Sequence, residues 1–159
     1  MASTSIAGFA SGIIVALAIM VGLSAGTQTT QAVMSGIVVV AFVEGFSDAF
    51  SEYLSQKTEG NLSIRTVWKE AAELFATKFI IIIQFIFPFI LLPLVDATQF
   101  AIFWGLFILS IISGYIARQQ EKRRIIRTMA LYVVAAIIII YITYNAGNLV
   151  AFIFSLIGI

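Results

Sequence analysis

The sequence predicts an all-α membrane protein with five transmembrane helices, arranged as a single domain over residues 1–159. The chain is 61% hydrophobic and only 11% charged, with a mean hydropathy of +1.07. That is far more apolar surface than one soluble core of this length can bury. A transmembrane helix needs roughly 20 mostly apolar residues, so the chain has room for about five with short connections. We therefore expect a multi-pass integral membrane protein without a separate soluble domain.

The first two helices are expected at residues 6–25 and 31–54, separated by an uncharged polar turn at 26–30. No basic region precedes the first apolar stretch, and more membrane helices follow it, so it is interpreted as a membrane helix and not as a signal peptide. The strictly apolar part of the second helix, 32–43, spans only about 18 Å as a helix. Because that is too short to cross a bilayer, the second helix must continue through Glu44 and beyond.

Three further helices are expected at residues 68–94, 99–117 and 128–150 or beyond. Trp68 is typical of an interfacial anchor at a helix start, while Pro88 and Pro93 predict a kink or an early end of the third helix. A basic segment, 118–127, separates the last two helices. The stretch after it is longer than a membrane is thick, and residues 145–148, Asn-Ala-Gly-Asn, are its expected break.

The basic residues orient the expected helices. All nine lie between helices two and three or four and five, or within a few turns of those connections: Lys57, Arg65, Lys69, Lys78, Arg118, Lys122, Arg123, Arg124 and Arg127. Cytoplasmic connections of membrane proteins carry an excess of Lys and Arg. This predicts a cytoplasmic N-terminus and a C-terminus that is outside or luminal, in a cell membrane or a vacuole-like membrane.

The second helix carries three carboxylates in register, Glu44, Asp48 and Glu52, here called the carboxylate ladder. Their spacing of four residues displaces successive members by about 40° around the helix and about 6 Å along it, so they form one stripe. Ser47 and Ser51 add hydroxyl groups on a neighbouring face. One carboxylate deep in a bilayer costs about 2.5 to 3.5 kcal/mol, so three together need a compensating partner.

Three interpretations of the ladder are open. The helix can leave the membrane near Glu44, or the ladder can bind a cation or relay protons. The ladder can also form a salt bridge with Lys78 within the membrane; if it does not, Lys78 is a snorkelling lysine at the membrane interface. Carboxylates and hydroxyls suit hard or borderline divalent cations. The predicted metal ligands are Glu44, Asp48 and Glu52, and the predicted residues of a transport path are Ser11, Ser47, Ser51 and Lys78.

Two other sets of residues have alternative interpretations. Gly8, Gly12 and Ala16 form a small-residue series on the first helix, suited either to a contact with helix two or to a dimer seam. Polar residues of the last helix line a path or form an interfacial belt and helix end: Tyr141, Thr143, Tyr144, Asn145 and Asn148.

The absence of cysteine and histidine excludes several kinds of chemistry. Disulfides, thiolate or imidazole metal sites, haem ligation by cysteine or histidine, and the usual nucleophile and base pairs of hydrolases all need one of these residues. Paired carboxylates alone can act as an aspartyl dyad, but an arrangement four residues apart on one helix argues against a dyad assembled from two facing elements. We therefore expect no enzyme activity and no permanently bound cofactor. No nucleic-acid partner is expected either.

Residues 44–55, which read EGFSDAFSEYLS, resemble the second-helix motif of the vacuolar iron transporter family, A-D-x-x-S-M-x-x-G-E-Y-x-S. Glu44 stands where many members have Asp, Ser47 matches the motif's Ser, and Glu52-Tyr53 matches its Glu and aromatic pair. The resemblance implies five membrane helices and a homodimer with a path near its two-fold axis. It also implies proton-coupled export of Fe²⁺ or Mn²⁺ from the cytosol, so that the transported divalent cation is the only metal involved.

The resemblance departs from the family motif at two positions. The family's first helix usually opens with an Asp-Gly pair in the transport path, and the aligned pair here is Ser11-Gly12. Asp48 replaces the family's methionine, a soft ligand, which makes the site harder. The cytoplasmic metal-gathering domain of some members is also missing between helices two and three. The rival expectation is a non-transporting assembly or regulatory subunit that has lost the helix-one acid.

Overall fold

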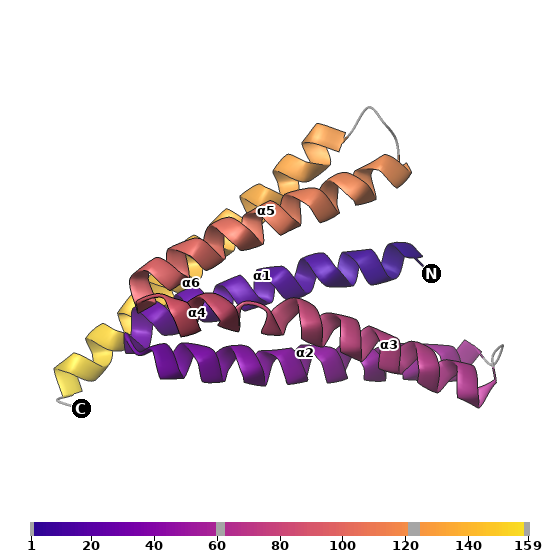
Figure 1. Cartoon of the computed structure of the whole chain (residues 1–159), viewed down its shortest axis with the longest axis horizontal. Helices are drawn as coiled ribbons and strands as arrows, with labels where there is room; N and C mark the ends of the chain where they lie inside the picture. Colours follow the sequence, from indigo (N-terminus) through magenta and orange to yellow (C-terminus); the bar gives the residue numbers. More distant parts are fainter. Residues whose placement is uncertain (1, 60–62, 121–124, 158–159) are drawn as a thin grey trace.

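The computed structural model describes residues 2–59, 63–120 and 125–157, and these are helical almost throughout (Figure 1). The helices are α1 (Ala2–Thr27), α2 (Thr30–Glu59), α3 (Ile64–Ile83), α4 (Ile86–Leu91), α5 (Leu94–Gln120) and α6 (Ile125–Ile157). Five segments of the described chain are long and apolar enough to cross a membrane, because α3 and α4 together form one span, Ile64–Leu91. The expected all-helical architecture with five helices able to span a membrane is therefore confirmed.

Helix α1 lies between two pairs of helices. It contacts α2 and α3 on one side and α5 and α6 on the other, and the two sides diverge toward the end of the bundle at which the N-terminus lies (Figure 1). Ala10, Ile13, Leu17 and Met20 of α1 are fully or almost fully buried in the shared core. The C-terminal end of α6 reaches the opposite end of the bundle, as an odd number of spans requires.

The third span is interrupted where the prolines predict it. Because Pro88 has no backbone N–H, it cannot donate to the carbonyl of Gln84, and that carbonyl instead accepts from Phe87 N at 3.2 Å. Leu92, which precedes Pro93, is extended and ends α4. The predicted kink and the predicted end of this span are therefore both present.

The expected break at residues 145–148 is wrong, because α6 runs without interruption from Ile125 to Ile157. Gly147 lies against Gly22 and Gly26 at the crossing of α1 and α6. A Cβ atom on Gly147 would overlap the carbonyl oxygen of Gly22, so only glycine permits this approach of the two backbones. The Asn145 side chain stays within the helix and donates to Tyr141 O at 2.7 Å.

Replacing Gly147 tests this crossing. Gly147→Ala should lower the free energy of unfolding by about 1 to 3 kcal/mol, since the added methyl group meets rigid backbone. Gly114→Ala is the matched control, because its Cβ would meet only the flexible Met129 side chain, with Sδ at 3.2 Å. Thermal unfolding in detergent micelles measures both, and equal losses would contradict the close crossing.

Candidate functional site

A lysine is enclosed within the membrane-spanning part of the bundle. The Lys78 side chain on α3 is 1% exposed, and its Nζ lies 2.8 Å from Glu44 Oε2 and 2.7 Å from Asp48 Oδ2. Lysine is almost never fully buried unless it is paired, and the two carboxylates supply that pairing. The structure thus brings together two predicted metal ligands and one predicted path residue, in the salt-bridge arrangement that the sequence left open.

Helix α2 positions both carboxylates toward the same neighbour. Since Glu44 and Asp48 are four residues apart, they lie one above the other on the face of α2 that packs on α3. Gly45 permits this packing, because a Cβ there would lie 2.8 Å from Phe75 Cδ2 and 3.3 Å from Phe75 O. One ammonium group on α3 therefore reaches two acids of α2.

The small residues of α1 provide the room for the lysine. A Cβ on Gly12 would lie 3.3 Å from Lys78 Cδ, and one on Gly8 would lie 3.6 Å from Asp48 Oδ2. Two members of the predicted small-residue series thus contact the charged cluster of the same chain. Ala16, the third member, is fully buried.

Ser11 of α1 completes the coordination of the ammonium group. Lys78 Nζ donates to Ser11 Oγ at 3.2 Å, and that hydroxyl donates to Gly8 O at 2.8 Å. The ammonium group thus donates to Glu44 and to Ser11, and it forms an ion pair with Asp48. We call Ser11, Glu44, Asp48 and Lys78 the lysine cluster.

The lysine cluster has one carboxylate in excess and is open on one side. Its formal charge is −1, and the Glu44 and Asp48 side chains are 25% and 31% exposed, in contrast to Lys78. Ser11 is exposed as well. The accessible members of the cluster are therefore those on α1 and α2.

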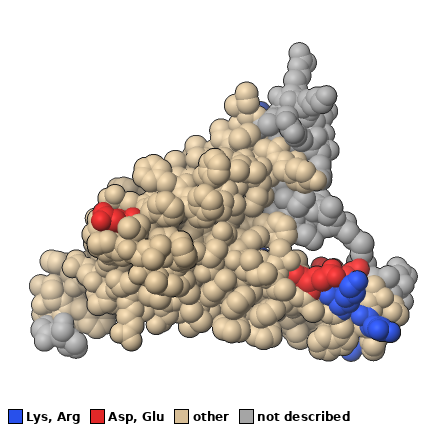
Figure 2. Space-filling model, in the orientation of Figure 1, with Lys and Arg blue, Asp and Glu red and all other residues tan. Residues whose placement is uncertain are grey.

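The lysine cluster lies within the span of the helices and not at their ends. Counted from Thr30, Glu44 is about 21 Å and Asp48 about 27 Å along α2, and a hydrocarbon core is about 30 Å thick. Glu52, at about 33 Å, lies near the limit of such a core. Charged side chains appear on the visible face mainly at the end of the bundle where α2 ends and α3 begins (Figure 2).

The other predicted site residues lie apart from the lysine cluster. Ser47 and Ser51 are exposed on α2. Glu52 does not reach Lys78 and instead accepts from Gln56 Nε2 at 2.5 Å. The same amide nitrogen also donates to Glu70 on α3. Within the described ranges no three acidic residues are placed to hold one metal ion, since the ladder rises about 6 Å per member.

Sequence reasoning missed the contribution of Gln56 and Glu70. Gln56 continues the ladder four residues after Glu52, a spacing that the sequence does show. The part played by Glu70 depends on the register in which α3 packs on α2, which no local pattern indicates. Lys122, Arg123 and Arg124, used for the orientation, lie outside the described residues.

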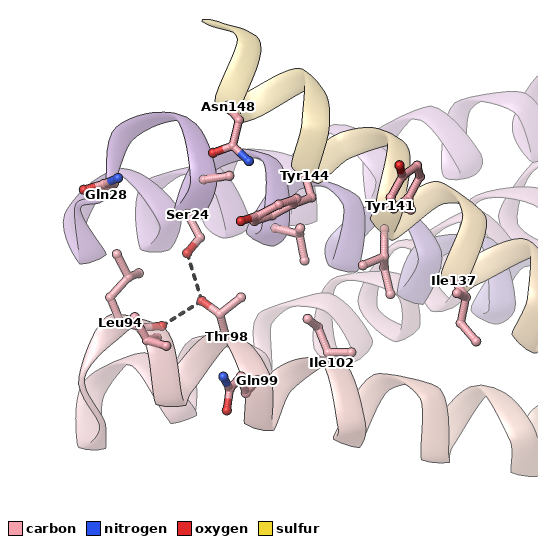
Figure 3. Close-up of a pocket in the computed structure, with 14 residues that line it drawn as sticks. Ser24, Gln28, Leu94, Thr98, Gln99, Ile102, Ile137, Tyr141, Tyr144 and Asn148 are labelled. Atoms are coloured by element: carbon pink, nitrogen blue, oxygen red, sulfur yellow. Dashed lines mark hydrogen bonds between the residues drawn. The ribbon is translucent and has the colours of Figure 1, made fainter. Parts of the chain in front are cut away.

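A separate cavity of about 920 Å³ lies between α1, α5 and α6, toward the opposite end of the bundle (Figure 3). Tyr141, Tyr144 and Asn148 of α6 line it, while Thr143 and Asn145 are not among its lining residues. At the cavity, Thr98 of α5 donates a hydrogen bond of 3.1 Å to Ser24 Oγ of α1. Its lining is uncharged, so it shares no charged group with the lysine cluster.

Comparisons with known proteins give no relative: no protein-family model, no characterised protein and no solved structure matches the chain. The resemblance of residues 44–55 to one transporter motif is therefore an expectation from the sequence alone.

Replacing the lysine tests how the cluster is held together. Lys78→Met should lower the free energy of unfolding by about 3 kcal/mol, because Glu44 and Asp48 would lose their counter-charge. The triple variant Lys78→Met, Glu44→Gln, Asp48→Asn should recover most of that loss, since no charge is left unpaired. Thermal unfolding in detergent micelles measures both. A triple variant no more stable than Lys78→Met would contradict the ionic role of Lys78.

Proposed function

We propose that this chain is a membrane transporter for small divalent cations of the Fe²⁺ and Mn²⁺ class, and that Lys78 occupies the place of the cation when none is bound. The observation that carries the proposal is the enclosed Lys78 ammonium between Glu44 and Asp48. Ionisable groups within membrane spans are costly, and in membrane proteins they commonly mark ion pathways and proton relays.

The charge of the lysine cluster supports a divalent cargo. With protonated Lys78 the cluster carries −1, so one carboxylate is not neutralised. A divalent cation entering from the open side neutralises both carboxylates. When Lys78 then gives up its proton, the net charge becomes zero, as an apolar environment favours. In this scheme one proton leaves the cluster for each cation that binds, which couples cation movement to proton movement.

The proposal extends to the assembly and orientation of the chain. Two chains pair through α1 and α2, where the cluster has its open side, so that two sets of carboxylates border one path. The N-terminus is cytoplasmic and the C-terminus outside or luminal, in agreement with the positive-inside rule. The motif resemblance at Glu44, Ser47 and Glu52 supports the same class of cargo and export from the cytosol. No enzyme activity, permanent cofactor or nucleic-acid partner belongs to this proposal.

One observation favours a different function. Lys78 is fully paired inside the chain, by two carboxylates and the Ser11 hydroxyl, as in a cluster that only fastens helices together. A non-transporting assembly or regulatory subunit would keep such a cluster and would carry no acid at Ser11. Transport measurements separate the two functions.

Transport through the cluster requires its carboxylates. The double variant Glu44→Gln, Asp48→Asn should reduce Mn²⁺ flux into proteoliposomes by about tenfold or more, because both anionic ligands are lost. Glu73→Gln is the matched control, since Glu73 is exposed and pairs with Lys69 at 3.7 Å outside the cluster. Flux of Fe²⁺, Co²⁺ and Zn²⁺ measured in parallel establishes the selectivity.

Unchanged flux in the double variant would exclude the role proposed for Glu44 and Asp48. A parent chain without flux for any of the four cations would favour the non-transporting subunit. Ser11→Asp, which places an acid beside Lys78, should then restore flux if that subunit is a degenerate transporter.

Proton coupling requires a lysine at position 78. Lys78→Arg keeps the positive charge, but an arginine does not release its proton in proteins. We therefore expect Lys78→Arg to remain folded and to lose about tenfold or more in Mn²⁺ flux together with the accompanying proton movement. A pH-sensitive dye inside proteoliposomes measures the proton movement. Proton-coupled flux equal to that of the parent would show that Lys78 is not the coupling group.

A further inference from the structure

A second polar cluster joins the ends of α2 and α3. Gln56 of α2 is 7% exposed, and its Nε2 atom donates both to Glu52 Oε1 and to Glu70 Oε2. Its Oε1 atom is enclosed and has no hydrogen-bond partner within the described part of the chain. Burying an amide oxygen without a partner is unfavourable, because the oxygen loses its hydration and gains no hydrogen bond in return.

The two carboxylates of this cluster lack an ionic partner among the described residues. Every ion pair found there involves other acids: Glu44 and Asp48 with Lys78, and Glu73 with Lys69. Two acids from different helices thus converge on one neutral nitrogen atom. Like charges this close repel each other strongly where water is partly excluded, so the cluster favours a positive charge between them.

We infer that Glu52, Gln56 and Glu70 form a binding site for a hard divalent cation, separate from the lysine cluster. Rotating the Gln56 amide by about 180° puts its oxygen where the nitrogen now lies, between the two carboxylates. The cation then has three oxygen ligands, two anionic and one neutral, and water supplies the others, as such cations prefer. The amide nitrogen takes the place of the unpartnered oxygen, so at most one amide atom stays unpaired, as before the rotation.

This site consists of other residues than the lysine cluster of the proposed transport function, and it lies at another position along α2. Glu70 and Gln56 belong to no transport path predicted from the sequence, and Glu52 lies near the limit of the hydrocarbon core, one turn beyond Asp48 on α2. Cation binding here also links α2 to α3 through charged ligands from both helices. The inference concerns equilibrium binding, which is measured without any transport.

Binding of Mn²⁺ to the full chain in detergent micelles tests the inference. Loss of the paramagnetic resonance signal of free Mn²⁺ measures binding to metal-free protein. Glu70→Gln and Glu52→Gln should each weaken binding by about tenfold or more, because each removes one anionic ligand. Gln56→Glu should strengthen it by about tenfold, since it adds a third carboxylate between the other two. Glu73→Gln, one turn further along α3 and outside the cluster, should leave binding unchanged.

The outcomes distinguish this site from the proposed transport function. If the double variant Glu44→Gln, Asp48→Asn binds Mn²⁺ like the parent and Glu70→Gln does not, the site is supported whatever the flux measurements show. A parent chain that binds no Mn²⁺ at millimolar concentration would overturn the site. So would Glu70→Gln and Glu52→Gln variants that keep the parent's affinity while eluting as folded protein in size-exclusion chromatography.

Discussion

An ammonium group held between two carboxylates inside an apolar bundle is the interaction on which the rest of this structure depends. Because lipid offers no hydrogen bonds, an ionisable side chain within the bundle is costly without a partner, and Lys78, Glu44 and Asp48 are partners of one another. That contact ties one residue of α3 to two residues of α2 and so favours a single register between the two helices. Charge pairing thus specifies the register of the two helices, which apolar packing alone would specify less strictly.

Small residues allow the backbones to approach closely enough for this pairing. Gly8 and Gly12 leave space on α1 for the lysine stem, and Gly45 lets Phe75 of α3 lie against α2. The same device recurs where α1 meets α6, at Gly22, Gly26 and Gly147. In lipid the hydrophobic effect does not drive helices together, so close backbone contact through small residues contributes a large part of the association.

The sequence predicted the spans well and the partners of the charged residues less well. Helix length and apolar composition depend on local residues, so five spans and the kink near Pro88 followed directly. The expected break at residues 145–148 was wrong because Gly147 serves a contact with another helix, which a local pattern cannot show. For the same reason, the ladder read as one site, whereas packing against α3 assigns Glu44 and Asp48 to Lys78, and Glu52 to Gln56 and Glu70.

The position of Lys78 gives a physical meaning to the two departures from the family motif. Ser11 and Asp48 come from different helices, yet both contact the same ammonium group, at 3.2 Å and 2.7 Å. An acid at position 11 and a neutral residue at position 48 would therefore give the cluster the same charge as Ser11 with Asp48. The two arrangements present the same charge to a divalent cation and differ only in the helix that carries the second acid. Under the proposed function, Asp48 would therefore supply the charge that the resembling motif places at position 11, and the motif's soft methionine would have no counterpart.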